Sequence, residues 1–178
     1  MRPIPAQAVD AVALLEAPPV RAAVSFGGVL AVGAFLATRH EGFVDRSVDA
    51  VLARPWVSVL YGFVAYGLVV TLGAYAVSQL AALGGGPGVA TGALAVVAGV
   101  VLLLSGLGFL VTGSLVTALW GPRRPWPGLV IAASAGTVAL LALPLGVGMA
   151  AWTLLAAFGL GGPTRRWIHA SRTAGPDG

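Results

Sequence analysis

Four long apolar runs dominate this chain, and together they contain no Asp, Glu, Lys, Arg or His. The runs cover residues 22–38, 56–83, 89–120 and 128–160. A helix needs about 20 consecutive apolar residues to cross the hydrocarbon core of a bilayer. Only 9% of the 178 residues are charged, against about 25% in an ordinary soluble domain. This number of ionic groups is too small to cover a water-exposed surface. We therefore predict an all-α fold in the form of a polytopic transmembrane helical bundle.

The N-terminal segment 1–21 is more polar than the runs that follow. It holds a short helical pattern, Ala6–Glu16, closed by Pro18 and Pro19. This pattern predicts a loose tail or an interfacial helix. A signal peptide is the alternative, because the apolar run 22–38 follows directly. No A-x-A cleavage pattern ends that run, which favours a retained anchor.

The segment 43–53 alternates apolar and charged residues at helical spacing, which predicts an amphipathic helix on the membrane interface. Pro55 ends this pattern, and Trp56 then marks the headgroup level. The expected apolar face is Phe43, Val44, Val48, Val51 and Leu52, and the charged side chains that point away are Asp45, Arg46 and Asp49.

The second and third runs are joined by the short loop 84–88, which predicts an antiparallel helical hairpin. Small residues four positions apart allow helix backbones to approach closely in lipid. Three such pairs occur in and beside these runs, namely Gly67 with Thr71, Gly88 with Gly92, and Gly113 with Thr117.

The last apolar run, residues 128–160, is too long for one straight span. Its 33 residues would form a helix of about 50 Å, against a hydrocarbon thickness of about 30 Å. Pro144 lies at its centre and removes a backbone donor. Gly146 and Gly148 follow and permit the positive φ of a reversal. These three residues form the predicted hinge. The alternative is a single span that is kinked at the same residues.

The distribution of arginine favours the reversal. Four spans would place five of the ten Arg residues on each side of the membrane, whereas a reversal at Pro144 places eight on one side and two on the other. Topology follows such asymmetry in short loops. We therefore predict about five membrane segments, at 22–38, 56–83, 89–120, 128–143 and 145–160. The chain would be a multi-pass protein of the cell membrane, with a basic cytoplasmic tail, 161–178, that begins where Gly161, Gly162 and Pro163 end the last helix.

Tryptophan and arginine cluster at the predicted membrane boundaries. Amphipathic aromatic rings and basic side chains both favour the headgroup level on the cytoplasmic side. The predicted interfacial anchors are Trp56, Trp120, Arg123, Arg124, Trp126, Arg165, Arg166 and Trp167.

Several segments occur in an order seen in a known group of proteins. An amphipathic segment ending in ARP is followed by VSVLYGF, a helical hairpin, a basic turn, and ALPLGVGMAAWTLLAAFGLGG before RRW. Over Val48–Trp167 the chain resembles small haloarchaeal multi-span membrane proteins, and it is similar to the membrane region of archaeal bactofilin-like, polymer-forming proteins. The most specific segments are Pro144–Gly148 and Phe158–Gly162. The resemblance implies a fold and a membrane location, in a group whose function is uncharacterised. The β-helical polymer-forming domain of that family has no counterpart in this chain.

Residues with catalytic or ligand-binding chemistry are few. The chain has no cysteine, and no basic stripe with interleaved aromatics that would bind nucleic acid. His40, Glu41, Asp45 and Asp49 are the only cluster of metal-ligand types, and solvated loop charges explain them more simply. We expect no cofactor, no metal and no enzymatic activity.

Two functions are compatible with these features. The first is a non-enzymatic scaffold, anchor or accessory subunit, whose partners would be membrane lipids and a second copy of the chain or another membrane protein. The alternative is a small transporter or channel for a neutral solute, which would need a wet cavity with convergent hydroxyls near Pro144.

Overall fold

The computed structural model describes residues 17–39, 41–84 and 86–170, and these residues form six α-helices without a strand. Five of the helices are long and apolar enough to cross a membrane. The predicted all-α, polytopic bundle with five membrane segments is therefore confirmed. The predicted helix at Ala6–Glu16 lies outside the described residues, as do His40 and residues 171–178. The helices are α2 (Pro18–Arg39), α3 (Glu41–Ala53), α4 (Pro55–Ala82), α5 (Pro87–Ala118), α6 (Pro125–Ala142) and α7 (Leu145–Ala170).

Proline begins four of the five long helices. Pro18, Pro55, Pro87 and Pro125 are the first residues of α2, α4, α5 and α6. Proline is tolerated there because the first helical N–H groups have no partner within the helix. Pro18 and Pro19, which were expected to close the N-terminal pattern, therefore begin α2. Trp126 lies in the first turn of α6.

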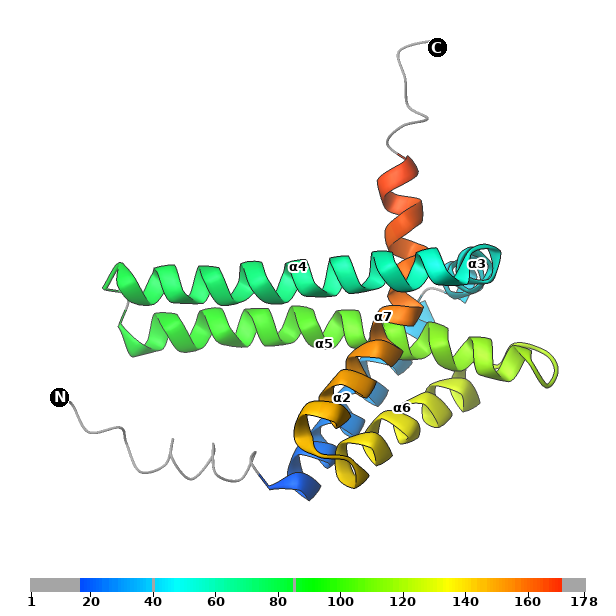
Figure 1. The fold of residues 1–178 in the computed structure, drawn as a ribbon, viewed down its shortest axis with the longest axis horizontal. Helices are drawn as coiled ribbons and strands as arrows, with labels where there is room; N and C mark the ends of the chain where they lie inside the picture. The colour runs from blue at the N-terminus through cyan, green and yellow to red at the C-terminus, as the bar shows by residue number, and fades with distance from the viewer. Residues whose placement is uncertain (1–16, 40, 85, 171–178) are drawn as a thin grey trace, which may run out of the picture.

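Helices α5 and α7 form the centre of the bundle. Helix α5 contacts each of the other five described helices, and α7 contacts α3, α4, α5 and α6. Helices α4 and α5 run side by side as a long hairpin, and α2, α6 and α7 cross it near one end (Figure 1). The other end of the hairpin extends away from the bundle, and none of the described residues from Gly67 to Leu104 is buried.

The last apolar run reverses at Pro144, as predicted. Helix α6 ends at Ala142, and Leu143 is extended, with φ −105° and ψ 154°. Helix α7 begins at Leu145 and packs back against α6. The expected role of the glycines was wrong, because Gly146 and Gly148 lie within α7 and neither has a positive φ.

Gly148 is instead required by the closeness of α6 and α7. A Cβ added at this residue would lie 2.7 Å from the carbonyl oxygen of Ala139, inside van der Waals contact. Gly146 faces open space. Extended backbone at Leu143 makes the turn, and Gly148 lets the two helices approach.

Helix α7 continues through Gly161, Gly162 and Pro163 to Ala170, so the expectation that these residues end the helix was wrong. Gly161 and Gly162 pack against the backbone of α4 and α3, which holds this part of α7 in place. Pro163 has no backbone N–H to donate within the helix. At the next residue, the Thr164 hydroxyl donates to the Leu160 carbonyl at 2.9 Å.

Closely packed crossings between helix backbones hold the bundle together. A Cβ added at Gly62 of α4 would overlap the Ala157 carbonyl of α7, and one added at Gly161 would overlap the Ser58 carbonyl of α4. Ser58 and Gly62 are thus one small pair, four residues apart, and Ala157 and Gly161 are the other. Only small residues permit this approach, which maximises dispersion contact in lipid.

The predicted small pairs are only partly at such crossings. Gly113 of α5 meets the backbone of Gly128 of α6. Gly67, Gly88 and Gly92 face open space in this structure. The expected face of α3 also needs correction. Val44, Val48 and Val51 are fully buried, but Phe43 is 38% exposed and Leu52 is 53% exposed.

An aromatic cluster fills the centre of the bundle. The ring of Phe109 lies 5.4 Å from that of Trp152, and Tyr66 meets Trp152 edge-on at 6.5 Å. Gly136 of α6 makes room for this cluster, because a Cβ there would lie 2.7 Å from the Phe109 ring. The cluster joins α4, α5, α6 and α7 in one core.

Candidate functional site

The predicted interfacial anchors gather at one end of the molecule. We call this the α3 end, and define it as helix α3, the first turn of α4, the turn 119–124 between α5 and α6, and residues 164–168 of α7. Trp56, Trp120 and Trp167 are at least 80% exposed there. Trp126 is half-exposed in the first turn of α6. Exposed indole rings at this level suit a membrane interface.

Two salt bridges join the turn between α5 and α6 to helix α3. The Arg123 guanidinium donates to Asp49 Oδ1 at 2.6 Å and lies 3.9 Å from Asp45 Oδ1. Both carboxylates therefore pair with a cation. Among the described residues, no group of three or more His, Cys, Asp or Glu side chains could hold a metal ion.

The second basic contact joins the end of α7 to the same helix. The Arg166 guanidinium donates to the backbone carbonyl of Arg46 at 3.2 Å. The Arg46 side chain folds back along α3, since its Nη1 lies 3.5 Å from a Cβ built on Gly42. Arg166 thus contacts α3 at the Arg46 carbonyl, and the Arg46 guanidinium lies one turn earlier, beside Gly42.

Three of the polar side chains inside the bundle, Ser105, Thr112 and Ser114, bond to backbone or to another side chain, whereas the buried Ser58 hydroxyl has no hydrogen-bond partner among the described residues. The Ser105 hydroxyl donates to the Val101 carbonyl and lies 3.4 Å from the Tyr66 hydroxyl. Thr112 of α5 donates to the Leu155 carbonyl of α7 at 2.9 Å, which is a hydrogen bond between helices. The Ser114 hydroxyl donates to Leu110 within α5. These groups stabilise helix packing, and they do not converge on the Pro144 turn.

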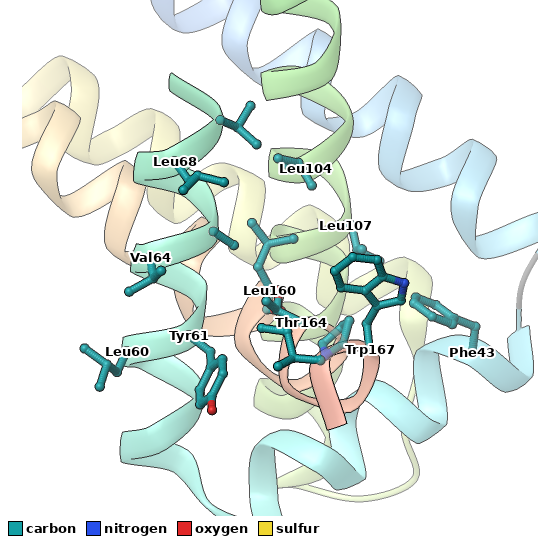
Figure 2. Close-up of a pocket in the computed structure, with 14 residues that line it drawn as sticks. Phe43, Leu60, Tyr61, Val64, Leu68, Leu104, Leu107, Leu160, Thr164 and Trp167 are labelled. Atoms are coloured by element: carbon teal, nitrogen blue, oxygen red, sulfur yellow. The ribbon is translucent and has the colours of Figure 1, made fainter. Parts of the chain in front are cut away.

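An apolar groove of about 660 Å³ opens at the α3 end (Figure 2). Its volume lies within the range of about 300–1,000 Å³ typical of small-molecule sites. Helices α3, α4, α5 and α7 all contribute to its wall. The lining residues are Phe43, Leu60, Tyr61, Val64, Ala65, Leu68, Val69, Leu104, Leu107, Leu160, Pro163, Thr164, Trp167 and Ile168.

The polar groups of this groove lie at one end only. Figure 2 shows Tyr61, Thr164 and Trp167 near α3, and Leu68 and Leu104 at the opposite end of the view. Between the two ends the wall is aliphatic. The groove is therefore amphiphilic, with a polar mouth and an apolar length. Such a shape suits a hydrocarbon chain that carries a polar head.

Of the predicted site residues, only Trp167 lines this groove. No sequence signal distinguishes the other lining residues, because Leu60, Val64 and Leu68 resemble any apolar residues of a membrane helix. Their equal spacing of four along α4 places them on one face, but which face α7 leaves open depends on the tertiary structure. Comparison with family models, with curated proteins and with solved structures gives no match to this chain.

Proposed function

We propose that this chain is a non-enzymatic scaffold, anchor or accessory subunit of the cell membrane. The five apolar helices are compatible with an integral membrane protein. The observation that supports the finer proposal is the interior of the bundle, where helix backbones meet directly at Gly62 and Gly161. A transport pathway needs water-accessible polar groups at membrane depth. Here the central space is filled by Phe109 and Trp152.

The proposal includes an orientation. Seven described arginines lie at or next to the α3 end, and one, Arg21, lies in the first turn of α2. By the positive-inside rule the α3 end and the C-terminal tail face the cytoplasm. The seven are Arg39, Arg46, Arg54, Arg123, Arg124, Arg165 and Arg166.

The exposed part of the α4–α5 hairpin is the surface offered to surrounding lipid, to a second copy or to a partner membrane protein. Its helices have 28 and 32 residues, or about 42 and 48 Å at 1.5 Å per residue. The resemblance to small haloarchaeal membrane proteins stays a prediction, and the reversal at Pro144 is compatible with it.

Flux measurements in proteoliposomes test the absence of transport. Purified protein is reconstituted, and the entry of glycerol, urea and a neutral sugar is followed by light scattering after osmotic shock. We expect the rates of protein-free liposomes, because the bundle interior is packed. Solute-specific flux that rises with the amount of protein would overturn the scaffold proposal in favour of a transporter.

A further inference from the structure

We propose that the groove at the α3 end binds one acyl chain of an anionic membrane phospholipid, with its phosphate beside Arg46 and Arg54. This site goes beyond the scaffold function, and the tests of the two are independent. The first argument is the shape and chemistry of the groove. Leu60, Val64 and Leu68 follow one another along α4 at single-turn spacing and form one apolar wall (Figure 2).

The depth of the groove suits a hydrocarbon chain. From Tyr61 to Leu68 the α4 wall rises about 10 Å at 1.5 Å per residue. Leu104 and Leu107 of α5 line the groove together with this wall, and Leu160 and Thr164 of α7 line it as well. A neutral polar solute would leave its hydrogen-bonding groups without partners along this wall, at considerable cost. An acyl chain carries no such groups.

The second argument is charge at the polar mouth. Arg54 immediately precedes α4, whose first residue is Pro55, so it lies about 10 Å along the helix axis from Tyr61, at the α3 end of that helix. Its carbonyl accepts the first hydrogen bond of that helix, from Ser58 at 3.0 Å. Arg46 lies one turn from Phe43, which lines the groove, and its backbone carbonyl holds Arg166.

Two of the three acidic residues of α3 are paired with a third arginine. Asp45 and Asp49 pair with Arg123 on the side of α3 that faces the α5–α6 turn. The seven arginines of the α3 end also outnumber the acidic residues of α3, which are Glu41, Asp45 and Asp49, so this end of the molecule carries an excess of positive charge. Guanidinium groups bind phosphate through charge-assisted hydrogen bonds. An anionic headgroup complements this mouth better than a zwitterionic one, whose choline group would meet the same cations.

Native mass spectrometry on the full chain tests whether Arg46 and Arg54 select an anionic headgroup. The protein is delipidated and offered an equal mixture of phosphatidylglycerol and phosphatidylcholine. We expect the wild-type chain to retain phosphatidylglycerol about tenfold more than phosphatidylcholine. The double variant Arg46→Gln/Arg54→Gln should lose this preference. The control Arg39→Gln/Arg124→Gln removes two exposed arginines of the same region and should keep it.

A second pair of variants tests the groove. Val64 lines the groove and is exposed, so Val64→Trp should fill the space without disturbing the core and should abolish lipid retention. Leu72→Trp is the control, because Leu72 is similarly exposed on α4 but lies outside the groove. Equal retention by both tryptophan variants would overturn the proposal. So would equal phosphatidylglycerol preference in both arginine variants, or a dimer mass in place of the lipid adduct.

Fluorescence of the unaltered groove provides a test that does not depend on the folding of these variants. Trp167 lines the groove, so lipids with brominated acyl chains should quench it on binding. We expect stronger quenching by brominated phosphatidylglycerol than by brominated phosphatidylcholine, with the difference absent in Trp167→Phe. A difference that persists in Trp167→Phe would place the lipid elsewhere and overturn the proposal.

Discussion

The two halves of the α4–α5 hairpin are both apolar and rich in glycine, but their environments differ. In the half beside α7, Gly62 and Gly108 lie against the backbone of another helix, so that any side chain would overlap it. In the extended half, Gly67 and Gly92 meet nothing within 4 Å. Glycine content therefore does not distinguish a helix crossing from a lipid-facing surface. What distinguishes them is whether a third helix crosses at that level.

The largest difference in stability between the halves should come from replacing one glycine in each half with valine. Gly62→Val places a branched side chain against the Ala157 carbonyl. We expect it to lower the free energy of unfolding by about 3 kcal/mol or more, because backbone cannot move aside as a side chain can. Gly67→Val is the matched control five residues away, and it should change stability by less than about 0.5 kcal/mol.

Unfolding of both variants in mixed micelles, followed by circular dichroism, measures this contrast. Equal losses of stability in Gly62→Val and Gly67→Val would mean that the extended half is packed against a partner in the membrane, or that the α4–α7 crossing is absent. Either result would break the comparison between the halves.

A smaller effect is expected from the hydrogen bond between α5 and α7. Thr112→Val removes the donor to the Leu155 carbonyl while it keeps the side-chain volume. Hydrogen bonds between membrane helices contribute about 0.6 kcal/mol on average, and we expect a loss of about 0.5–1 kcal/mol. Thr71→Val, in the exposed half of α4, should cost less. A larger loss in Thr71→Val than in Thr112→Val would contradict this assignment.

The sequence predicts the segments of this fold well and their contacts poorly. Uncharged runs and the arginine asymmetry were sufficient for five apolar helices and for the reversal at Pro144. Both depend on the transfer of side chains into lipid, which is a local property. The continuation of α7 through Pro163 could not be predicted locally, because packing of Gly161 and Gly162 on α4 and α3 outweighs the helix-breaking tendency of these residues.

The groove also lay beyond sequence reasoning. Its walls come from four helices, and its lining residues have the same chemistry as those that face lipid or the core. Only its mouth had a local signal, since Trp167 and the neighbouring Arg165 and Arg166 were predicted at the interface. Which arginines pair with carboxylates depends on how α3 docks on the α5–α6 turn, where Arg123 forms salt bridges with Asp45 and Asp49.

The most direct measurement is labelling of single cysteines from one side of the membrane, which the absence of native cysteine makes simple. Trp120→Cys and Trp167→Cys probe the α5–α6 turn and the end of α7, and Leu83→Cys probes the α4–α5 turn; all three native side chains are exposed. In intact cells a membrane-impermeant maleimide should label Leu83→Cys alone, and the other two only after permeabilisation. Labelling of Trp120→Cys and Trp167→Cys from opposite faces would contradict the reversal at Pro144 and the bundle built on it.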